Sequence, residues 1–347
     1  MKESPVPGIP LKTTFPDCMS LDELPYFIKD EFGRLKLDPA LGLRIIDAHT
    51  HIGLSYFFRG KIDLWKKTPE VFHNFPARGN PIDLQNYGHS DLTPENLKIM
   101  QRDLVNACFL GSVRARSQTI PNLLTEMDDF CVSHCAVLSI EVRFMFSNNY
   151  VIFENLKNED RLIPFCCVHP SRGRVEERLD QWIEAGARGL KFHPVFMTIA
   201  PDDERALSLF RLCAQRGLPI ISHTSASGSE PAYCGKFGRL EPFEKAIQAA
   251  EGVPFILGHS GMMNEWKTAI DFASRYDNTY LETSGQPIHV LHEMFARVPH
   301  HRILHGTDWP FYPMSLQLAK TLVATEGNDA LRDKILYGNM AKILGIE

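Results

Sequence analysis

Short apolar runs alternate with amphipathic segments from about residue 160 to the end of the chain. The run RLIPFCCVHP is typical of a buried strand, and VEERLDQWIEAGARG after it has helical spacing of Val175, Leu179 and Trp182, with Gly186 near its end. The same order recurs in GLKFHP (189–194) and DERALSLFRLCAQRG (203–217), and helical segments also follow at 241–252 and 265–276. Successive strand candidates begin about 25–35 residues apart, which predicts βα units and a parallel sheet covered by helices.

The strand candidates number eight, which is the number that closes a (β/α)₈ TIM barrel. They lie at residues 45–51, 135–140, 162–168, 189–193, 219–223, 254–259, 279–283 and 302–307. The widest gap follows the first strand, so we predict a distorted α/β barrel over residues 44–347, with residues 54–120 largely an insertion. Residues 1–43 are predicted to be an N-terminal extension packed on the barrel, with a short helix in LDELPYFIKDEF (21–32).

Composition narrows the classes of function. The 347 residues are 44% hydrophobic, a length that fits either two domains or one large barrel. A net charge of −5 with scattered basic residues gives no electrostatic footprint for nucleic acid. No run approaches the roughly 20 apolar residues that span a membrane, and the N-terminus lacks the apolar core of a secretion signal. We therefore expect a cytoplasmic protein that binds neither nucleic acid nor membranes.

Two histidines stand at the end of the first predicted strand, in IIDAHTHIG (45–53). Alternate strand residues point the same way, so His49 and His51 face one side, which in a closed barrel can be the interior. Neutral imidazoles at this spacing offer two ligands to a divalent metal. Taken alone, the pair fits a loop or a solvent-facing strand end equally well.

Three further strand ends carry residues of the same chemistry. ISHTS ends with His223, LGHSG contains His259, and HGTDWP contains Asp308. Each one alone fits a buried core histidine or a helix N-cap aspartate. Together on one rim of a barrel they would be costly to bury without a cation, so the set predicts a metal site. Asp47 is expected to orient a ligand from behind.

The ordered motifs DAHTHIG, GLKFHP, ISHTS, LGHSG and HGTDWP, followed by YGNMAKILGI, resemble the amidohydrolase superfamily, family 2, the branch that contains aminocarboxymuconate-semialdehyde decarboxylase. The resemblance covers roughly residues 44–347 apart from the inserted residues 54–90. It implies a small-molecule substrate, a homodimer as one arrangement, and one or two divalent ions, with zinc as first choice and manganese or another transition metal as alternatives. The implied metal ligands are His49, His51, His223, His259 and Asp308.

Lys191 in GLKFHP occupies the strand on which binuclear members of the superfamily carry a carboxylated lysine that bridges both metals. Decarboxylase-type mononuclear relatives lack this lysine. Lys191 is therefore predicted to be a metal ligand. There are two alternatives: it forms an ion pair with Asp47 or Glu282, or its ammonium group binds a substrate anion. His193 has the same strand parity and is expected to face inward with it.

The first functional hypothesis is a metal-dependent hydrolase that uses a metal-activated water to cleave an amide, lactone or ester bond. Asp308 is then the predicted proton acceptor, and His259, if it is not a ligand, stabilises the oxyanion or relays the proton. The second is a metal-dependent non-oxidative decarboxylase or hydratase of a small carboxylic acid, with Asp308 or His259 as proton donor. A non-catalytic barrel is disfavoured because every expected ligand position is filled.

Substrate anions need cationic partners, and the candidates are Arg59, Arg143 and Arg239. Trp309 beside the Asp308 motif is a candidate for the pocket wall. Each of these side chains fits an ordinary surface or packing position as well.

Overall fold

The computed structural model describes residues 11–53, 62–109, 112–143, 147–226 and 232–346. At its centre are eight strands, β4 (Ile45–Thr50), β6 (Val132–Leu138), β7 (Leu162–Phe165), β8 (Leu190–Phe192), β9 (Ile220–His223), β10 (Phe255–Gly258), β11 (Thr279–Glu282) and β12 (Ile303–Leu304). Each one overlaps a range predicted from the apolar runs. The eight predicted strands are therefore confirmed.

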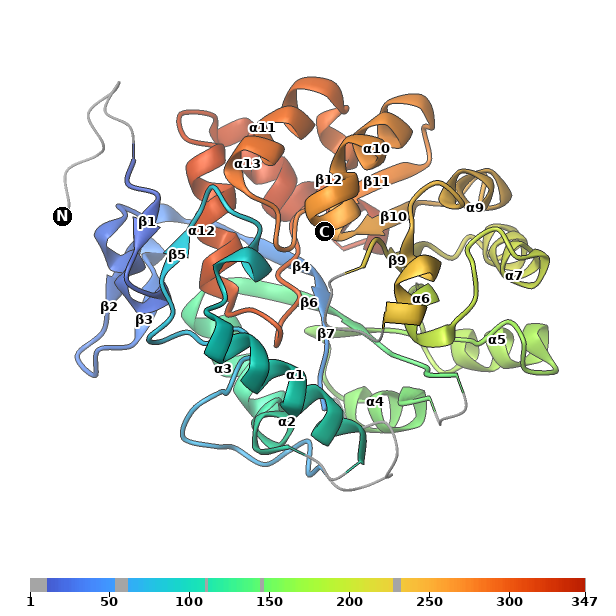
Figure 1. The fold of residues 1–347 in the computed structure, drawn as a ribbon, viewed down its shortest axis with the longest axis horizontal. Coiled ribbons are helices and arrows are strands. Elements are labelled where there is room, and N and C mark those ends of the chain that lie inside the picture. Colours follow the sequence, from blue (N-terminus) through green and yellow to red (C-terminus); the bar gives the residue numbers. More distant parts are fainter. Residues whose placement is uncertain (1–10, 54–61, 110–111, 144–146, 227–231, 347) are drawn as a thin grey trace.

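The strands pair in parallel in the order of the chain (Figure 1). One sheet contains β4, β6 and β7, and a second runs from β8 to β12. Single parallel bridges join the two sheets at both seams, Cys166 with Leu190 and Thr50 with Trp309. This arrangement is a distorted (β/α)₈ barrel, as predicted from the sequence.

Alternate residues of the strands face inward and outward. On β10, Phe255 faces outward and packs against Phe210 and Phe243 of the covering helices. Ile256, the next residue of β10, faces inward and belongs to a separate buried cluster inside the barrel. That cluster consists of Ile46, Ala48, Ala136, Leu138, Phe165, Ile221, Ile256 and Leu304, together with Met340, Ala341 and Leu344 of the last helix.

Helices surround the strands as an outer ring (Figure 1). They are α4 (Asn149–Leu156), α5 (Val175–Glu184), α7 (Glu204–Gln215), α9 (Phe243–Ala249), α10 (Met262–Arg275), α11 (Ile288–Arg297), α12 (Met314–Ala324) and α13 (Asp329–Asp333), whereas the last helix, α14 (Asn339–Leu344), packs against the inner cluster. Single-turn α6 (Pro194–Met197) and α8 (Ala232–Gly235) follow β8 and β9. The helices predicted after the third to sixth strands are thus present. None of the helices in the described ranges is long and apolar enough to cross a membrane.

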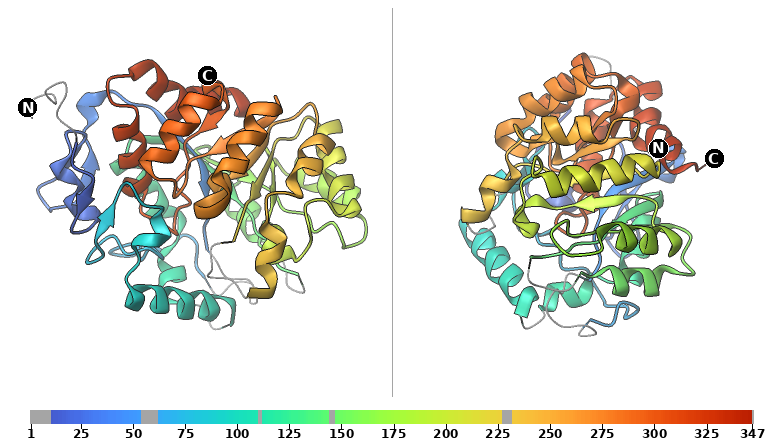
Figure 2. Two further views of the ribbon diagram at one scale, coloured as in Figure 1. Left: turned by 45° about the horizontal axis from the view of Figure 1, so that its top comes forward. Right: turned by 90° about the vertical axis from the view of Figure 1, so that its right-hand side faces the viewer.

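The long connection between β4 and β6 has its own elements in the described residues. These are β5 (Ile82–Asp83), the 3₁₀ helix η3 (Gly88–Asp91), α1 (Pro94–Phe109), α2 (Val113–Ser117) and α3 (Ile120–Asp129). In Figure 2 the teal helices of this segment lie at the edge of the molecule. The first strand of the chain, β1 (Thr14–Phe15), pairs antiparallel with β5, so the N-terminal segment contacts the insertion.

The prediction of a helix at residues 21–32 is wrong. A 3₁₀ helix, η1 (Cys18–Glu23), ends before Pro25, and the hairpin of β2 (Phe27–Lys29) and β3 (Leu35–Leu37) follows. Proline lacks the N–H of a helical hydrogen bond and disfavours helical geometry in the preceding residue. Leu24 is accordingly extended, with φ of −78° and ψ of 150°.

Gly189, directly before β8, leaves room for the ring of Phe165 inside the barrel. A Cβ atom at Gly189 would lie 2.0 Å from Cε1 of Phe165. We expect Gly189→Ala to lower the free energy of unfolding by about 1–3 kcal/mol, because overfilling a packed core forces its neighbours to move. The urea midpoint measures this effect. The control is Gly173→Ala, where the new Cβ has no atom within 4 Å, and equal midpoints for the two variants would contradict the prediction.

Candidate metal centre

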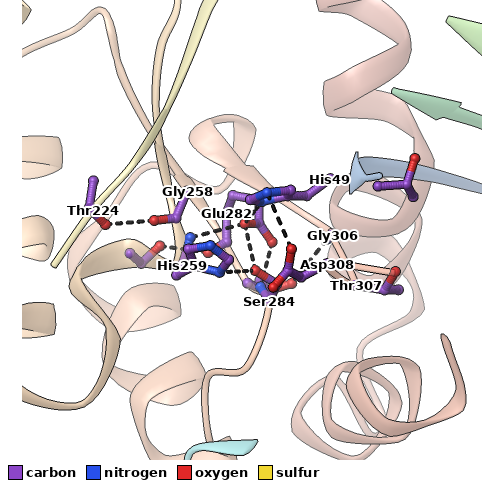
Figure 3. Close-up of polar contacts among 12 residues, drawn as sticks. His49, Thr224, Gly258, His259, Glu282, Ser284, Gly306, Thr307 and Asp308 are labelled. Carbon is purple, nitrogen blue, oxygen red and sulfur yellow. Dashed lines mark hydrogen bonds and ion pairs between the residues drawn. The ribbon is translucent and has the colours of Figure 1, made fainter. Parts of the chain in front are cut away.

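The structure brings six predicted site residues together at the carboxyl ends of the barrel strands. They lie on or directly after five different strands and are His49, His51, Lys191, His223, His259 and Asp308. Because parallel strands end at the same rim of a barrel, residues far apart in the chain meet there. Figure 3 shows His49, His259 and Asp308 directed toward one another.

His49 and His51 share the carboxylate of Asp308. Its Oδ1 atom lies 3.5 Å from Nε2 of His49 and 3.6 Å from Nε2 of His51. The pairing of β4 with β6 shifts register between Asp47 and Thr50. Because of this irregularity, His49 and the preceding residue, Ala48, both face the interior of the barrel.

Asp47 holds the two strand ends next to each other. Its Oδ1 atom accepts hydrogen bonds from the backbone N–H groups of His49 (3.0 Å) and Thr307 (2.9 Å). The backbone N–H of Asp308 in turn donates to the carbonyl oxygen of His49. Asp47 therefore supports the backbone beneath the candidate ligands.

The histidines of the neighbouring strands lie beside this group. The ring centroid of His259 is 4.6 Å from that of His49 and 4.8 Å from that of His223. His193, which shares its strand with Lys191, stacks between the rings of His223 and Phe196. Its inward position agrees with the strand parity.

Each of three imidazoles is oriented by a hydrogen bond at Nδ1. His49 donates to Glu282 (2.9 Å) and His51 donates to the carbonyl oxygen of Leu138 (2.8 Å). His259 donates to the hydroxyl of Ser284 (2.7 Å), which itself donates to Glu282. Nε2 of each ring is then the atom that would bind a metal, an arrangement that is general for metal-binding histidines; Nε2 of His49 contacts Lys191 in this structure.

Burial keeps these imidazoles uncharged. It lowers the pKa of His51 to about 3 and the pKa values of His49, His223 and His259 well below the usual range, and the nearby Lys191 ammonium adds to the effect. Neutral imidazole is the form that binds a metal. Ligand atoms of His49, His259 and Asp308 lie within 4.8 Å of one another. Nitrogen and carboxylate ligands of this kind fit a divalent ion such as zinc.

Lys191 lies within the same cluster. Its Nζ is 3.1 Å from Nε2 of His49, and the side chain is buried. Burial lowers the pKa of this lysine to about 8, against the opposing effect of the Asp308 and Glu282 carboxylates. Burial likewise raises the pKa of Asp308 well above its usual range, and Lys191 opposes that shift.

The backbone is strained at two of the candidate ligands. His259 has φ of 60° and Asp308 has φ of 59°, in the left-handed region that residues other than glycine seldom adopt. Such strain persists only where surrounding contacts hold it, and it concentrates at functional sites. One such contact is the hydrogen bond from the hydroxyl of Ser260 to the carbonyl oxygen of Glu282 (2.7 Å).

Glu282 is a central residue of the site that the sequence reasoning considered only as a partner for Lys191. Its carboxylate accepts from His49 Nδ1, from the hydroxyl of Ser284 and from the backbone N–H of His259 (Figure 3). Gly306 leaves room for it, because a Cβ there would lie 2.3 Å from Oε1 of Glu282. The available sequence signal was an acid at the end of the strand NTYLETSG, on the same rim as the histidines.

Glu282→Gln is expected to weaken binding of zinc by about 10–100-fold, because residues that orient metal ligands typically contribute this much. The amide keeps the shape of the side chain but supplies one acceptor oxygen fewer. Competition with a chromophoric chelator measures the affinity, with the exposed Glu251→Gln as control. An unchanged affinity in Glu282→Gln would remove Glu282 from this role.

The candidate substrate residues are not assembled at this site in the same way. Arg59 falls outside the described residues. Arg143 is exposed and donates to the hydroxyl of Thr198 (3.0 Å), and Arg239 is also exposed. Trp309 is wholly buried, and its indole N–H donates to Glu126 (2.8 Å), so it offers no accessible surface to a substrate.

Comparison with known proteins identifies the family. The family model Amidohydro_2, described as amidohydrolase, matches residues 136–346, which is more than half of the chain. The chain belongs to the amidohydrolase family. This agrees with the resemblance of the sequence motifs and places the candidate metal centre in a family of metal-dependent enzymes. A search of curated protein sequences found no significant match.

Solved structures share the fold of this amidohydrolase. An uncharacterized TIM-barrel protein from Bordetella bronchiseptica has a TM-score of 0.61 at 18% identity, covering 87% of this chain and 99% of its own. A 5-carboxyvanillate decarboxylase from Sphingomonas paucimobilis has 0.60 at 16% identity, covering 88% and 100%. A probable 2-pyrone-4,6-dicarboxylic acid hydrolase from Acinetobacter baumannii has 0.53 at 10% identity, covering 87% and 99%. At these identities the likeness shows the fold alone.

Proposed function

We propose that this amidohydrolase is a metal-dependent hydrolase that cleaves an amide, lactone or ester bond of a small molecule. The observation that carries the proposal is the position of Lys191 among the candidate ligands. It contacts His49, and its charge acts on His51, His223 and His259. A lysine in this place is what a shared, carboxylated ligand of two metal ions requires.

The proposed ligands are His49, His51, His223, His259, Asp308 and, after carboxylation, Lys191. Carboxylation joins the neutral lysine nitrogen to the carbon of CO₂ and releases one proton. Divalent ions held here would polarise the substrate carbonyl and make a water more acidic. Asp308 accepts the proton of the attacking water and returns it to the leaving group, and His259 takes part in this step, by stabilising the oxyanion or relaying the proton, only where it is not a ligand.

The second candidate is a metal-dependent decarboxylase or hydratase of a small carboxylic acid. The observation that favours it is the position of the buried Asp308 carboxyl group beside His49 and His51, where a protonated Asp308 could deliver its proton to a bound substrate carbon. In decarboxylation the bond to the carboxylate breaks, CO₂ leaves, and the carbon takes up that proton. Lys191 as an ammonium group would then pair with the substrate carboxylate.

Elemental analysis combined with ¹³C NMR separates the two candidates. After incubation with ¹³C-bicarbonate and zinc, the hydrolase proposal expects two metal equivalents and a carbamate signal that disappears in Lys191→Met. One equivalent without a carbamate signal would favour the lyase. Protein that binds no divalent metal would contradict both. Turnover is then compared on lactones, esters and amides, and on aromatic and unsaturated acids with detection of CO₂.

A further inference from the structure

Glu126 of α3 collects three hydrogen bonds in the interior, away from the candidate ligands. Its Oε2 atom accepts from the ring of His73 (2.9 Å) and from the indole of Trp309 (2.8 Å). Its Oε1 atom accepts from the backbone N–H of Met314 (2.9 Å). Glu126 and His73 both belong to the connection between β4 and β6, whereas Trp309 and Met314 follow β12.

Residues 308–313, between β12 and α12, are called the Asp308 loop; Trp309 lies near its start, and Met314 follows directly after its end. One carboxylate therefore pins both ends of this loop. The insertion also bonds its middle, because the N–H groups of Asn74 and Phe75 donate to the carbonyl oxygens of Pro310 (3.0 Å) and Phe311 (2.7 Å). The connection between β4 and β6 therefore contacts the loop at both ends and in its middle.

The same loop contacts the histidines of β4. The backbone N–H of His51 donates to the carbonyl oxygen of Trp309 (2.6 Å), and the ring of Phe311 meets that of His51 edge to face at 6.2 Å. Asp308 itself has left-handed backbone geometry, which surrounding contacts must maintain. The fixed ends of the loop supply such contacts.

We propose that Glu126 is a positioning residue of the metal centre, which holds the Asp308 carboxylate in place through Trp309 and Met314. This inference rests on the proposed metal-dependent function. It assigns the connection between β4 and β6 a part in building the centre, in addition to any contact with substrate. Metal sites need their ligands held close to the productive geometry, so loosening the loop is expected to weaken metal binding.

Two variants loosen the loop in different ways. Glu126→Gln keeps the shape of the side chain but replaces one acceptor oxygen with an NH₂ group, so one donor loses its partner if Oε1 is replaced and two if Oε2 is replaced. Trp309→Phe removes the indole N–H that bonds Glu126, together with part of the ring volume, and keeps a smaller aromatic ring in the buried position. If the glutamine variant fails to fold, the phenylalanine variant still tests the proposal.

The matched control is Glu141→Gln. Glu141 is fully buried, whereas 12% of the Glu126 side chain is exposed, and Glu141 accepts from Arg172 (2.7 Å), Arg178 (3.2 Å) and the N–H of His169 (2.8 Å), which all follow β7. It resembles Glu126 in environment but binds a different part of the rim. A purely structural effect of losing a buried carboxylate should be similar in both variants.

The test is titration with Co²⁺, followed by its visible absorption, together with the melting temperature of each variant. We expect Glu126→Gln and Trp309→Phe to raise the dissociation constant about tenfold or more, and Glu141→Gln to leave it within about twofold. If the wild type binds Co²⁺ tightly and both loop variants bind it with the same affinity, this inference is overturned and the proposed function is not. A wild-type protein that takes up no Co²⁺ overturns the proposed function and this inference with it.

Discussion

Asp308→Asn is expected to lower turnover by a factor of about 10²–10⁴, the range that a positioned acid–base group contributes. The amide has nearly the same shape but can neither accept the proton of the attacking water nor return it to the leaving group. Asp308 Oδ1 lies 3.5–3.6 Å from two imidazole nitrogens, so the variant also loses a negative charge beside the metal ligands. Steady-state rates measure the effect, on whichever of the tested lactones, esters, amides and acids proves to be a substrate.

The fold should survive this substitution, because the backbone N–H of Asp308 keeps its bond to the carbonyl oxygen of His49. A circular dichroism spectrum and melting temperature check this. Asp160→Asn, at an exposed position, serves as the control and is expected to have wild-type activity. Wild-type turnover in Asp308→Asn would remove Asp308 from its assigned role in both proposed reactions.

His49→Asn is expected to weaken zinc binding by more than about 100-fold, since direct ligands contribute more than the residues that orient them. His49 lies at the centre of the site, where it contacts Lys191, Asp308 and Glu282. Metal bound only to the folded state stabilises it by about 2.7 kcal/mol when its free concentration is 100 times the dissociation constant. The variant should lose this stabilisation.

Thermal unfolding with and without a chelator measures this second effect. The wild-type melting temperature should fall when zinc is removed and recover when zinc is restored, whereas that of His49→Asn should not respond. His289→Asn on the exposed face of α11 is the control and should respond as the wild type does. A wild-type melting temperature that is insensitive to the chelator and to added zinc would contradict a metal centre.

The barrel could be predicted from the sequence because its signals are local. Each strand is a short apolar run, each helix has its own periodicity, and one βα unit follows another at regular spacing. The histidines and Asp308 could be placed on one rim because parallel strands of a barrel end at the same side. The wrong prediction of a helix at residues 21–32 also has a local cause, which is the proline at position 25.

The other contacts of the site depend on residues that are distant in the chain. Glu282 became a partner of His49 only when β4 and β11 were placed in one barrel, and no local pattern distinguishes it from other strand-end acids. Trp309 looked like a pocket residue from its neighbours, but the structure buries it and bonds it to Glu126. That bond joins residues 183 positions apart, so neither periodicity nor motif spacing carries information about it.

The sequence by itself determined the order of strands and helices and the kinds of side chain that stand at the strand ends. Hydrophobic periodicity and residue chemistry are properties of neighbouring positions, so they can be recognised without coordinates. Only the tertiary structure decided which nitrogen of His49, His51 and His259 makes the orienting hydrogen bond, how Lys191 lies among the candidate ligands, and which residues support the Asp308 loop. Those features depend on hydrogen-bond geometry and burial between segments that meet only when the barrel is formed.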